Sequence, residues 1–133
     1  MSINEEKVFL LLVDDEQDFL EAIERALSNR GFEVATAACG VDAIECLRRS
    51  QPDVAVLDVK MPDIDGVQLF KRLHLVYPDL PVILLTGHGT VQQAFETSRD
   101  GVFEYLTKPC DVDELAAVAR RAAGREARRI RIW

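Results

Sequence analysis

The chain has 133 residues, a net charge of −7 and 48% hydrophobic residues. This length suits one domain with a core of its own, and the acidic balance argues against nucleic-acid binding by the domain itself. The apolar run at 8–13 is too short for a signal peptide or a membrane span, which predicts a cytoplasmic protein with no membrane partner. The three cysteines lack metal-like spacing and are expected to be reduced thiols.

Short apolar runs alternate with amphipathic segments along the chain. The runs are rich in aliphatic residues and bounded by turn residues, which predicts strands at 8–13, 33–38, 53–58, 81–86 and 103–107. Apolar residues at helical spacing predict helices at 17–30, 41–50, 66–76, 90–100 and from 111 past 118. Gly31 is expected to end the first helix in the left-handed conformation. Val41 and Val76 are expected to face the core.

This alternation, with short connections, is typical of a parallel sheet covered by helices on both faces. Right-handed crossovers then favour an α/β fold: a single-domain, doubly wound (βα)5 flavodoxin-like sandwich with strand order 2-1-3-4-5. We predict that this domain covers residues 1–124. After position 119 six arginines face one glutamate, so residues 125–133 are predicted to be a basic helical extension or the start of a linker. A partner or DNA contact by this tail stays open.

Acidic side chains stand where two neighbouring strands are predicted to end. Asp14 and Asp15 follow the first strand, and Asp58 ends the third. Three carboxylates at one sheet edge cannot all stay ionised without a cation, and oxygen ligands suit Mg²⁺. Because neighbours on a strand point to opposite faces, one of Asp14 and Asp15 would bind the ion directly and the other through water. The alternative is that this pair caps the first helix.

Two further polar side chains stand at predicted strand ends. Thr86 ends the fourth strand and can donate to a phosphoryl oxygen, and Lys108 follows the fifth and can balance the acidic cluster as a point charge. The chain has no glycine-rich phosphate loop after its first strand. A carboxylate nucleophile at Asp58, a metal site, a hydroxyl and a lysine are the components of phosphoryl transfer to an aspartate.

At this point the sequence closely resembles a known family, the receiver domain of bacterial two-component response regulators. The segments LLVDDE, VLDVKMPDIDG, LLTGHG and YLTKP each stand at the family's spacing. The resemblance implies that a sensor histidine kinase phosphorylates Asp58. It also implies that Thr86 and Lys108 contact the phosphoryl group, and that Thr86 and Tyr105 form the switch pair. The TGHG segment and the arginine-rich end look most like receivers of enhancer-binding transcription activators.

The resemblance also implies a metal site and a backbone feature. Mg²⁺, for which Mn²⁺ can substitute, would be bound by Asp15, Asp58 and the backbone carbonyl of Lys60, with Asp14 acting through water. The Lys108–Pro109 peptide bond would be cis. Lys60 and His88 occupy positions where the family varies, and both are expected to modulate the access of water to the phosphoryl group; for His88, an exposed loop residue without a role is the alternative.

The function expected from these residues is a phosphorylation-activated signalling switch. It would not be an enzyme beyond assisting its own phosphorylation and dephosphorylation. The surface formed by the last two helices and the strand at 103–107 would change and regulate a downstream effector domain or protein, in transcription. A homodimer through those two helices stays open. Two rivals are a haloacid-dehalogenase-type phosphatase, whose nucleophile would follow the first strand, and a phosphorylation-independent interaction module.

Overall fold

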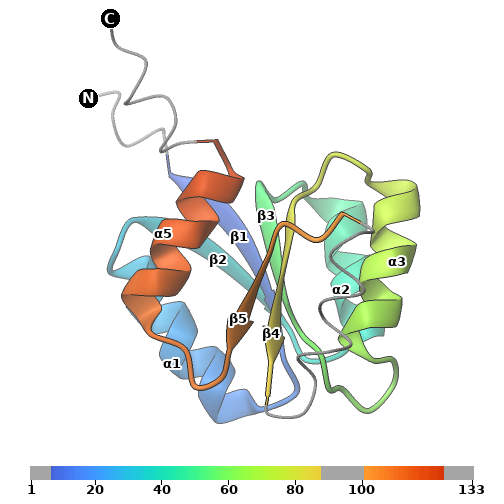
Figure 1. Cartoon of the computed structure of the whole chain (residues 1–133), viewed down its shortest axis with the longest axis horizontal. Helices are drawn as coiled ribbons and strands as arrows, with labels where there is room; N and C mark the ends of the chain where they lie inside the picture. The colour runs from blue at the N-terminus through green and yellow to red at the C-terminus, as the bar shows by residue number, and fades with distance from the viewer. Residues whose placement is uncertain (1–6, 88–100, 125–133) are drawn as a thin grey trace, which may run out of the picture.

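A parallel sheet of five strands forms the centre of the protein in this computed structural model, with helices against both faces (Figure 1). The structure describes residues 7–87 and 101–124. The strands are β1 (Val8–Val13), β2 (Phe32–Ala37), β3 (Val54–Asp58), β4 (Val82–Thr86) and β5 (Glu104–Thr107). The helices within these ranges are α1 (Gln17–Ser28), α2 (Gly40–Arg49), α3 (Gly66–Val76) and α5 (Val112–Ala122). The predicted helix at 90–100 and the predicted extension at 125–133 lie outside the described residues.

The strand order is β2-β1-β3-β4-β5 and all four pairings are parallel, which confirms the predicted doubly wound topology. The carboxyl ends of the strands therefore share one edge of the sheet, the lower edge in Figure 1. Every residue of β3 and β4 is buried. This is why these strands read as continuous apolar runs and not as alternating ones.

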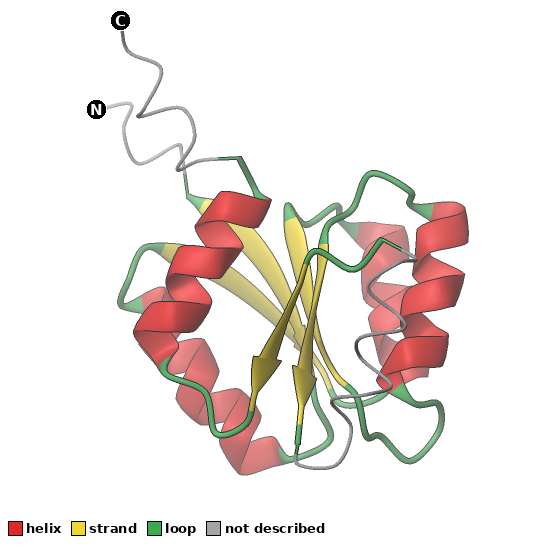
Figure 2. Cartoon of the chain, in the orientation of Figure 1, coloured by secondary structure: helices red, strands yellow, loops and turns green. Residues whose placement is uncertain are grey.

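Helices lie against both faces of the sheet (Figure 2), and each face packs its own hydrophobic core. Because strand side chains alternate between faces, Leu10 and Leu12 of β1 point into the core under α1 and α5. Leu11 and Val13 of the same strand point into the core under α2 and α3. Burial of these two cores holds the strand ends in place, since removing apolar surface from water is the dominant favourable term in folding.

Two residues expected in the core are exposed instead. Val41 is 68% exposed and Val76 is 67% exposed. The buried stripe of α2 consists of Gly40, Ala43 and Leu47, which leaves Val41 in the first turn facing outward. On α3 the corresponding inward position after the last turn is taken by Tyr77, which packs against the core. In both helices the predicted buried face included one apolar residue too many: Val41 at the start of α2 and Val76 at the end of α3.

Two other local expectations are met, at Gly31 and at the Lys108–Pro109 bond. Gly31 follows α1 with φ +88°, the left-handed conformation predicted for the end of that helix. The Lys108–Pro109 bond is cis. Asp111 caps α5, and its side chain accepts a hydrogen bond from the backbone N–H of Asp113. The cysteines are free thiols. None of the helices within 7–87 and 101–124 has the length and apolar character that a membrane span requires.

Candidate functional site

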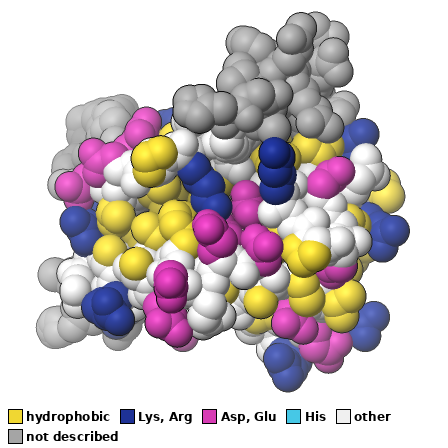
Figure 3. Space-filling view, turned by 90° about the horizontal axis from the view of Figure 1, so that it is seen from below, with side chains coloured by type: hydrophobic (Ala, Val, Ile, Leu, Met, Phe, Trp, Pro, Cys, Tyr) yellow, Lys and Arg dark blue, Asp and Glu magenta, His cyan; other side chains and the backbone are white. Residues whose placement is uncertain are grey.

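Three aspartates meet at the carboxyl edge of the sheet. Asp14 and Asp15 follow β1, and Asp58 ends the adjacent β3; each offers a carboxylate oxygen, and these oxygens lie within 4.8 Å of one another. Figure 3 shows acidic side chains gathered near the middle of this face. Asp14 is fully buried, Asp58 is 7% exposed and Asp15 is exposed. The two neighbours Asp14 and Asp15 thus occupy unlike environments, as strand geometry predicted.

Lys108 brings a positive charge to this cluster from the end of β5. Its Nζ atom lies 2.7 Å from Asp14 Oδ2 and 3.7 Å from Asp58 Oδ2. The ammonium group also lies 4.4 Å from the centre of the Phe19 ring and 3.6 Å from Glu16 Oε1. The backbone N–H of Lys108 donates to the carbonyl oxygen of Thr86 at 2.8 Å, which fixes the lysine beside the end of β4.

The electrostatics of the cluster are those of a site short of positive charge. Burial, followed by the neighbouring charge of Asp14, raises the pKa of Asp58 from 3.8 to about 6, although Lys108 and the Lys60 N–H act in the opposite direction. Burial by itself would lower the pKa of Lys108, but its hydrogen bond to Asp14 and the surrounding carboxylates outweigh burial, so that pKa is raised. Lys108 therefore stays charged, and its one charge serves several carboxylates.

This arrangement fits a small divalent cation. Carboxylate oxygens are the donors that Mg²⁺ prefers, and a cation would offset the repulsion that raises the pKa of Asp58. Both oxygens of Asp14 already accept hydrogen bonds, from Lys108 Nζ and from the backbone N–H of Glu16 at 2.9 Å. Asp15 and Asp58 are therefore better suited than Asp14 to bind such an ion directly.

The loop between β3 and α3 forms one wall of the site. The N–H of Lys60 approaches Asp58 Oδ1 at 3.4 Å, while the Lys60 residue as a whole is exposed. The N–H of Gly66, the first residue of α3, donates to the carbonyl oxygen of Val59 at 2.7 Å. A Cβ atom on Gly66 would overlap the carbonyl oxygen of Asp58, so this turn requires glycine. Asp65 caps α3 through the N–H of Gln68 at 2.9 Å.

The remaining predicted residues are distributed as follows. Thr86 ends β4 next to Asp58 in the sheet and is 2% exposed. Tyr105 lies on β5, partly buried against the core under α2 and α3. Their switch role stays a prediction. His88 lies outside the described residues, so the structure says nothing of its predicted modulating role.

Three residues in and around the site were not singled out from the sequence. Phe19 lies on α1, and its ring lies under the Lys108 ammonium. Glu16 precedes α1, and its carboxylate lies near Lys108 Nζ. Asp63 holds the loop after Asp58 to the start of α2. Adjacency to Asp15 was a signal for Glu16, but no local pattern pointed to the other two.

Comparison with known proteins agrees with this geometry. Residues 10–120 match the model of the response regulator receiver domain family. The chain therefore belongs to the response regulator receiver domains. Its fold is that of a receiver domain protein from Clostridium thermocellum, with a TM-score of 0.85 and 31% identity over 90% of this chain and 97% of that one. The receiver domain of NtrX from Brucella abortus gives a TM-score of 0.82 and 32% identity over 86% of this chain and 98% of that one.

Relatives by sequence are transcriptional regulators. The chain is 41% identical over 106 residues to the transcriptional regulatory protein GlrR of Escherichia coli K12, a match that covers 80% of this chain. It is 38% identical over 111 residues to the DNA-binding transcriptional regulator NtrC of the same strain, covering 84% of this chain. In both cases the match spans 24% of the relative. The chain thus corresponds to about a quarter of the length of the curated relatives it matches.

Proposed function

We propose that this domain is a phosphorylation switch in which Asp58 accepts a phosphoryl group from a sensor histidine kinase. The observation that carries the proposal is the buried carboxylate of Asp58 at the end of β3, with Lys108 Nζ 3.7 Å away and two further carboxylates beside it. An isolated aspartate would be a weak nucleophile, and this environment supplies what phosphoryl transfer needs: positioning and charge compensation.

The transfer itself is a single displacement at phosphorus. One oxygen of Asp58 forms a bond to phosphorus as the phosphorus–nitrogen bond of the kinase phosphohistidine breaks, and the bonding electron pair leaves with the imidazole. Lys108, held beside Asp58 through Asp14, pairs with the oxygens of the transferred group. The hydroxyl of Thr86, at the adjacent strand end, donates to the product. Lys60, exposed two residues after Asp58, tunes the access of water that later hydrolyses it.

Mg²⁺ is the cofactor that this donor set suits. Asp15, Asp58 and the backbone carbonyl of Lys60 would bind it, and Asp14 would act through water, because its own oxygens are engaged by Lys108 and Glu16. When bound, the ion supplies positive charge to the phosphoryl oxygens. Mn²⁺, which also suits carboxylate, carbonyl and water ligands, would substitute.

The output is a change in the surface that surrounds β5. Phosphorylation replaces the single negative charge of the Asp58 carboxylate by the nearly two negative charges of a phosphoryl group beside Thr86, and Thr86 with Tyr105 responds by shifting the population between two arrangements. The partner is a downstream effector, attached or separate, that acts in transcription, as the names of GlrR and NtrC suggest. The switch would act in the cytoplasm. The receiver itself does not contact DNA, which its acidic charge would repel. A homodimer through α5 and residues 90–100, which the sequence predicts to be a helix, is compatible with this output.

A small phosphodonor tests the chemistry without a kinase. We expect the intact mass of the protein to rise by one phosphoryl group when it is incubated with phosphoramidate or acetyl phosphate in the presence of Mg²⁺, and not in EDTA. Asp58→Asn removes the nucleophile and should prevent uptake. Stoichiometric uptake by Asp58→Asn would show that the site is wrong. Continuous turnover of a phosphate ester would favour a phosphatase, and no uptake in Mg²⁺ would favour a phosphorylation-independent module.

A further inference from the structure

The loop after the phosphoacceptor is tied to a helix on another part of the chain. Asp63, five residues after Asp58, places one carboxylate oxygen 3.1 Å from the N–H of Gly40 and the other 3.2 Å from the N–H of Val41. These are the first two residues of α2. In Figure 1 the loop that leaves β3 crosses the lower edge of the molecule, where α2 begins. The contact joins segments 22 and 23 residues apart in sequence.

The pairing is a helix cap supplied by a distant segment of the chain. The first N–H groups of a helix have no partner within the helix and sit at its positive end, where a carboxylate is favoured. Cys39, the residue before α2, makes no side-chain capping bond, so Asp63 fills that role from outside. The hydrogen bond from Gly40 is the largest reason why the pKa of Asp63 is lowered, although the side chain is exposed.

A second contact holds the same place. A Cβ atom on Gly40 would overlap the Cγ2 methyl of Ile64, so the loop lies directly against the helix backbone. Ile64 and Met61 are partly buried against the core under α2 and α3. The stretch from Lys60 to Ile64 is therefore fixed in two ways. Asp63 and Ile64 contact the start of α2, and the flanking residues Val59 and Gly66 are hydrogen-bonded to each other.

We propose that Asp63 is a positioning residue for the phosphoacceptor loop: by clasping the start of α2, it fixes the backbone that carries Lys60 beside Asp58. The consequence for metal binding rests on the proposed function, in which the Lys60 carbonyl binds Mg²⁺. Residues that orient ligands from behind commonly change metal affinity by one to two orders of magnitude when they are removed. The clasp itself concerns the metal-free chain and can be tested without the ion.

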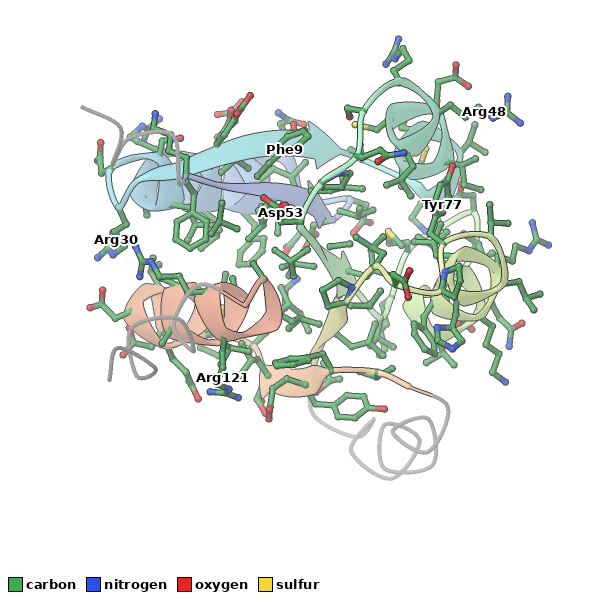
Figure 4. All side chains as sticks on the ribbon, turned by 90° about the horizontal axis from the view of Figure 1, so that it is seen from above. Phe9, Arg30, Arg48, Asp53, Tyr77 and Arg121 are labelled. Carbon is green, nitrogen blue, oxygen red and sulfur yellow. The ribbon has the colours of Figure 1, made fainter. Side chains whose placement is uncertain are left out.

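The first measurement follows backbone amides by NMR in the metal-free domain. Asp63→Ala should speed hydrogen exchange at Gly40 and Val41 and shift the amide resonances of Lys60 and Met61. Asp53→Ala is the matched control. The Asp53 carboxylate accepts a hydrogen bond from the Phe9 N–H at 2.8 Å (Figure 4), at the end of β3 opposite to Asp58. Asp53→Ala therefore also removes an acidic side chain and its contact with the backbone, but far from the loop. Unchanged loop amides in Asp63→Ala would overturn the proposal.

The second measurement is Mg²⁺ affinity by titration of the same amides. Asp63→Ala should weaken binding by about tenfold, whereas Asp53→Ala should bind like the wild type. Asp63→Asn keeps one acceptor oxygen and should lose only about threefold, since it leaves one of the two helix N–H groups without its partner. Gly40→Ala pushes the loop away through Ile64 without a change of charge, and it should weaken binding as well.

The Mg²⁺ affinities of these variants show whether Asp63 acts by positioning the loop or only by its negative charge. Equal losses in Asp63→Ala and Asp63→Asn, with a normal Gly40→Ala, would show that only the negative charge matters, which would overturn the proposal. The predicted order, with Gly40→Ala impaired, would support it. If the wild type shows no Mg²⁺ affinity, the proposed function fails, and the metal-free amide data alone then decide whether Asp63 sets the loop.

Discussion

Asp58 is buried, and in the metal-free domain this burial disfavours the ionised form of its carboxylate. Its pKa of about 6 means that the folded state holds a proton there between about pH 4 and pH 6, where the unfolded chain does not. The free energy of unfolding that this group contributes is fully present below pH 3.8 and is lost as the pH rises through about 6.

Replacing Asp58 by asparagine should therefore stabilise the metal-free domain at neutral pH. The expected gain is about 3 kcal/mol above pH 7, because the pKa is raised by about two units and each unit corresponds to about 1.4 kcal/mol. Below pH 4 the variant and the wild type should be nearly equal. Urea unfolding in EDTA across this pH range measures the difference. An increase in the free energy of unfolding that does not depend on pH would show that the ionised carboxylate of Asp58 is not what destabilises the wild type.

The Lys108–Asp14 pair has the opposite character, since here a partly buried ammonium group and a fully buried carboxylate stabilise each other. Lys108→Met keeps the length of the side chain but leaves the fully buried Asp14 without its cation. Removing one partner of a buried pair is strongly destabilising, and we expect a loss of about 3 kcal/mol in the free energy of unfolding. Adding Asp14→Asn to Lys108→Met should recover much of that loss.

A surface pair provides the control for this prediction. Arg121 lies 3.3 Å from Glu104, but both side chains are more than 40% exposed. Arg121→Met should cost less than about 1 kcal/mol, because solvent screens such pairs. Chemical denaturation of the wild type and these three variants at one pH compares the two pairs. Equal costs for Lys108→Met and Arg121→Met would show that the site lysine is not part of a buried network.

At the level of elements, the turn from β3 into α3 is set by a close backbone approach. A side chain at Gly66 would overlap the carbonyl oxygen of Asp58 and lie 2.8 Å from the Cα of Val59, and backbone atoms cannot move aside as a side chain can. Overpacking of this kind typically costs 1–3 kcal/mol, so we expect Gly66→Ala to lose about 3 kcal/mol. It should also disturb the site, because the strain falls on Asp58 itself.

Gly87→Ala is the matched substitution for Gly66→Ala. It also adds one methyl group close to the site, but nothing within residues 7–87 and 101–124 lies within 4 Å of the added Cβ. Its effect on the midpoint of thermal unfolding should be small, while Gly66→Ala should lower that midpoint by several degrees. Similar midpoints for the two variants would contradict the close approach at Gly66.

For the molecule as a whole, the sequence predicted the parts that depend on local patterns. Apolar runs of the right length gave the strands, and their order followed from short connections and handedness. Once the strands were placed, Asp14, Asp58, Thr86 and Lys108 had to meet at one edge. The errors at Val41 and Val76 arose because an apolar residue next to a buried stripe fits the pattern whether or not the helix faces the core there.

The contacts that the sequence did not predict are those between distant segments. Asp63 reaches the start of α2, and Phe19 lies under Lys108 from another helix. An aspartate in a turn and an aromatic residue on a helix are both common for local reasons, so neither residue stands out in the sequence. Their roles depend on how the loops lie against one another, which only the folded chain shows.

The proposed function depends most on Asp58 as the residue that accepts the phosphoryl group. The most direct measurement is to phosphorylate the domain with phosphoramidate and Mg²⁺, reduce the acyl phosphate with borohydride, and locate the product by peptide mass spectrometry. Reduction converts a phosphorylated aspartate to homoserine. The account predicts homoserine at position 58 and at no other aspartate. Homoserine at Asp14 or Asp15, with Asp58 unchanged, would contradict it.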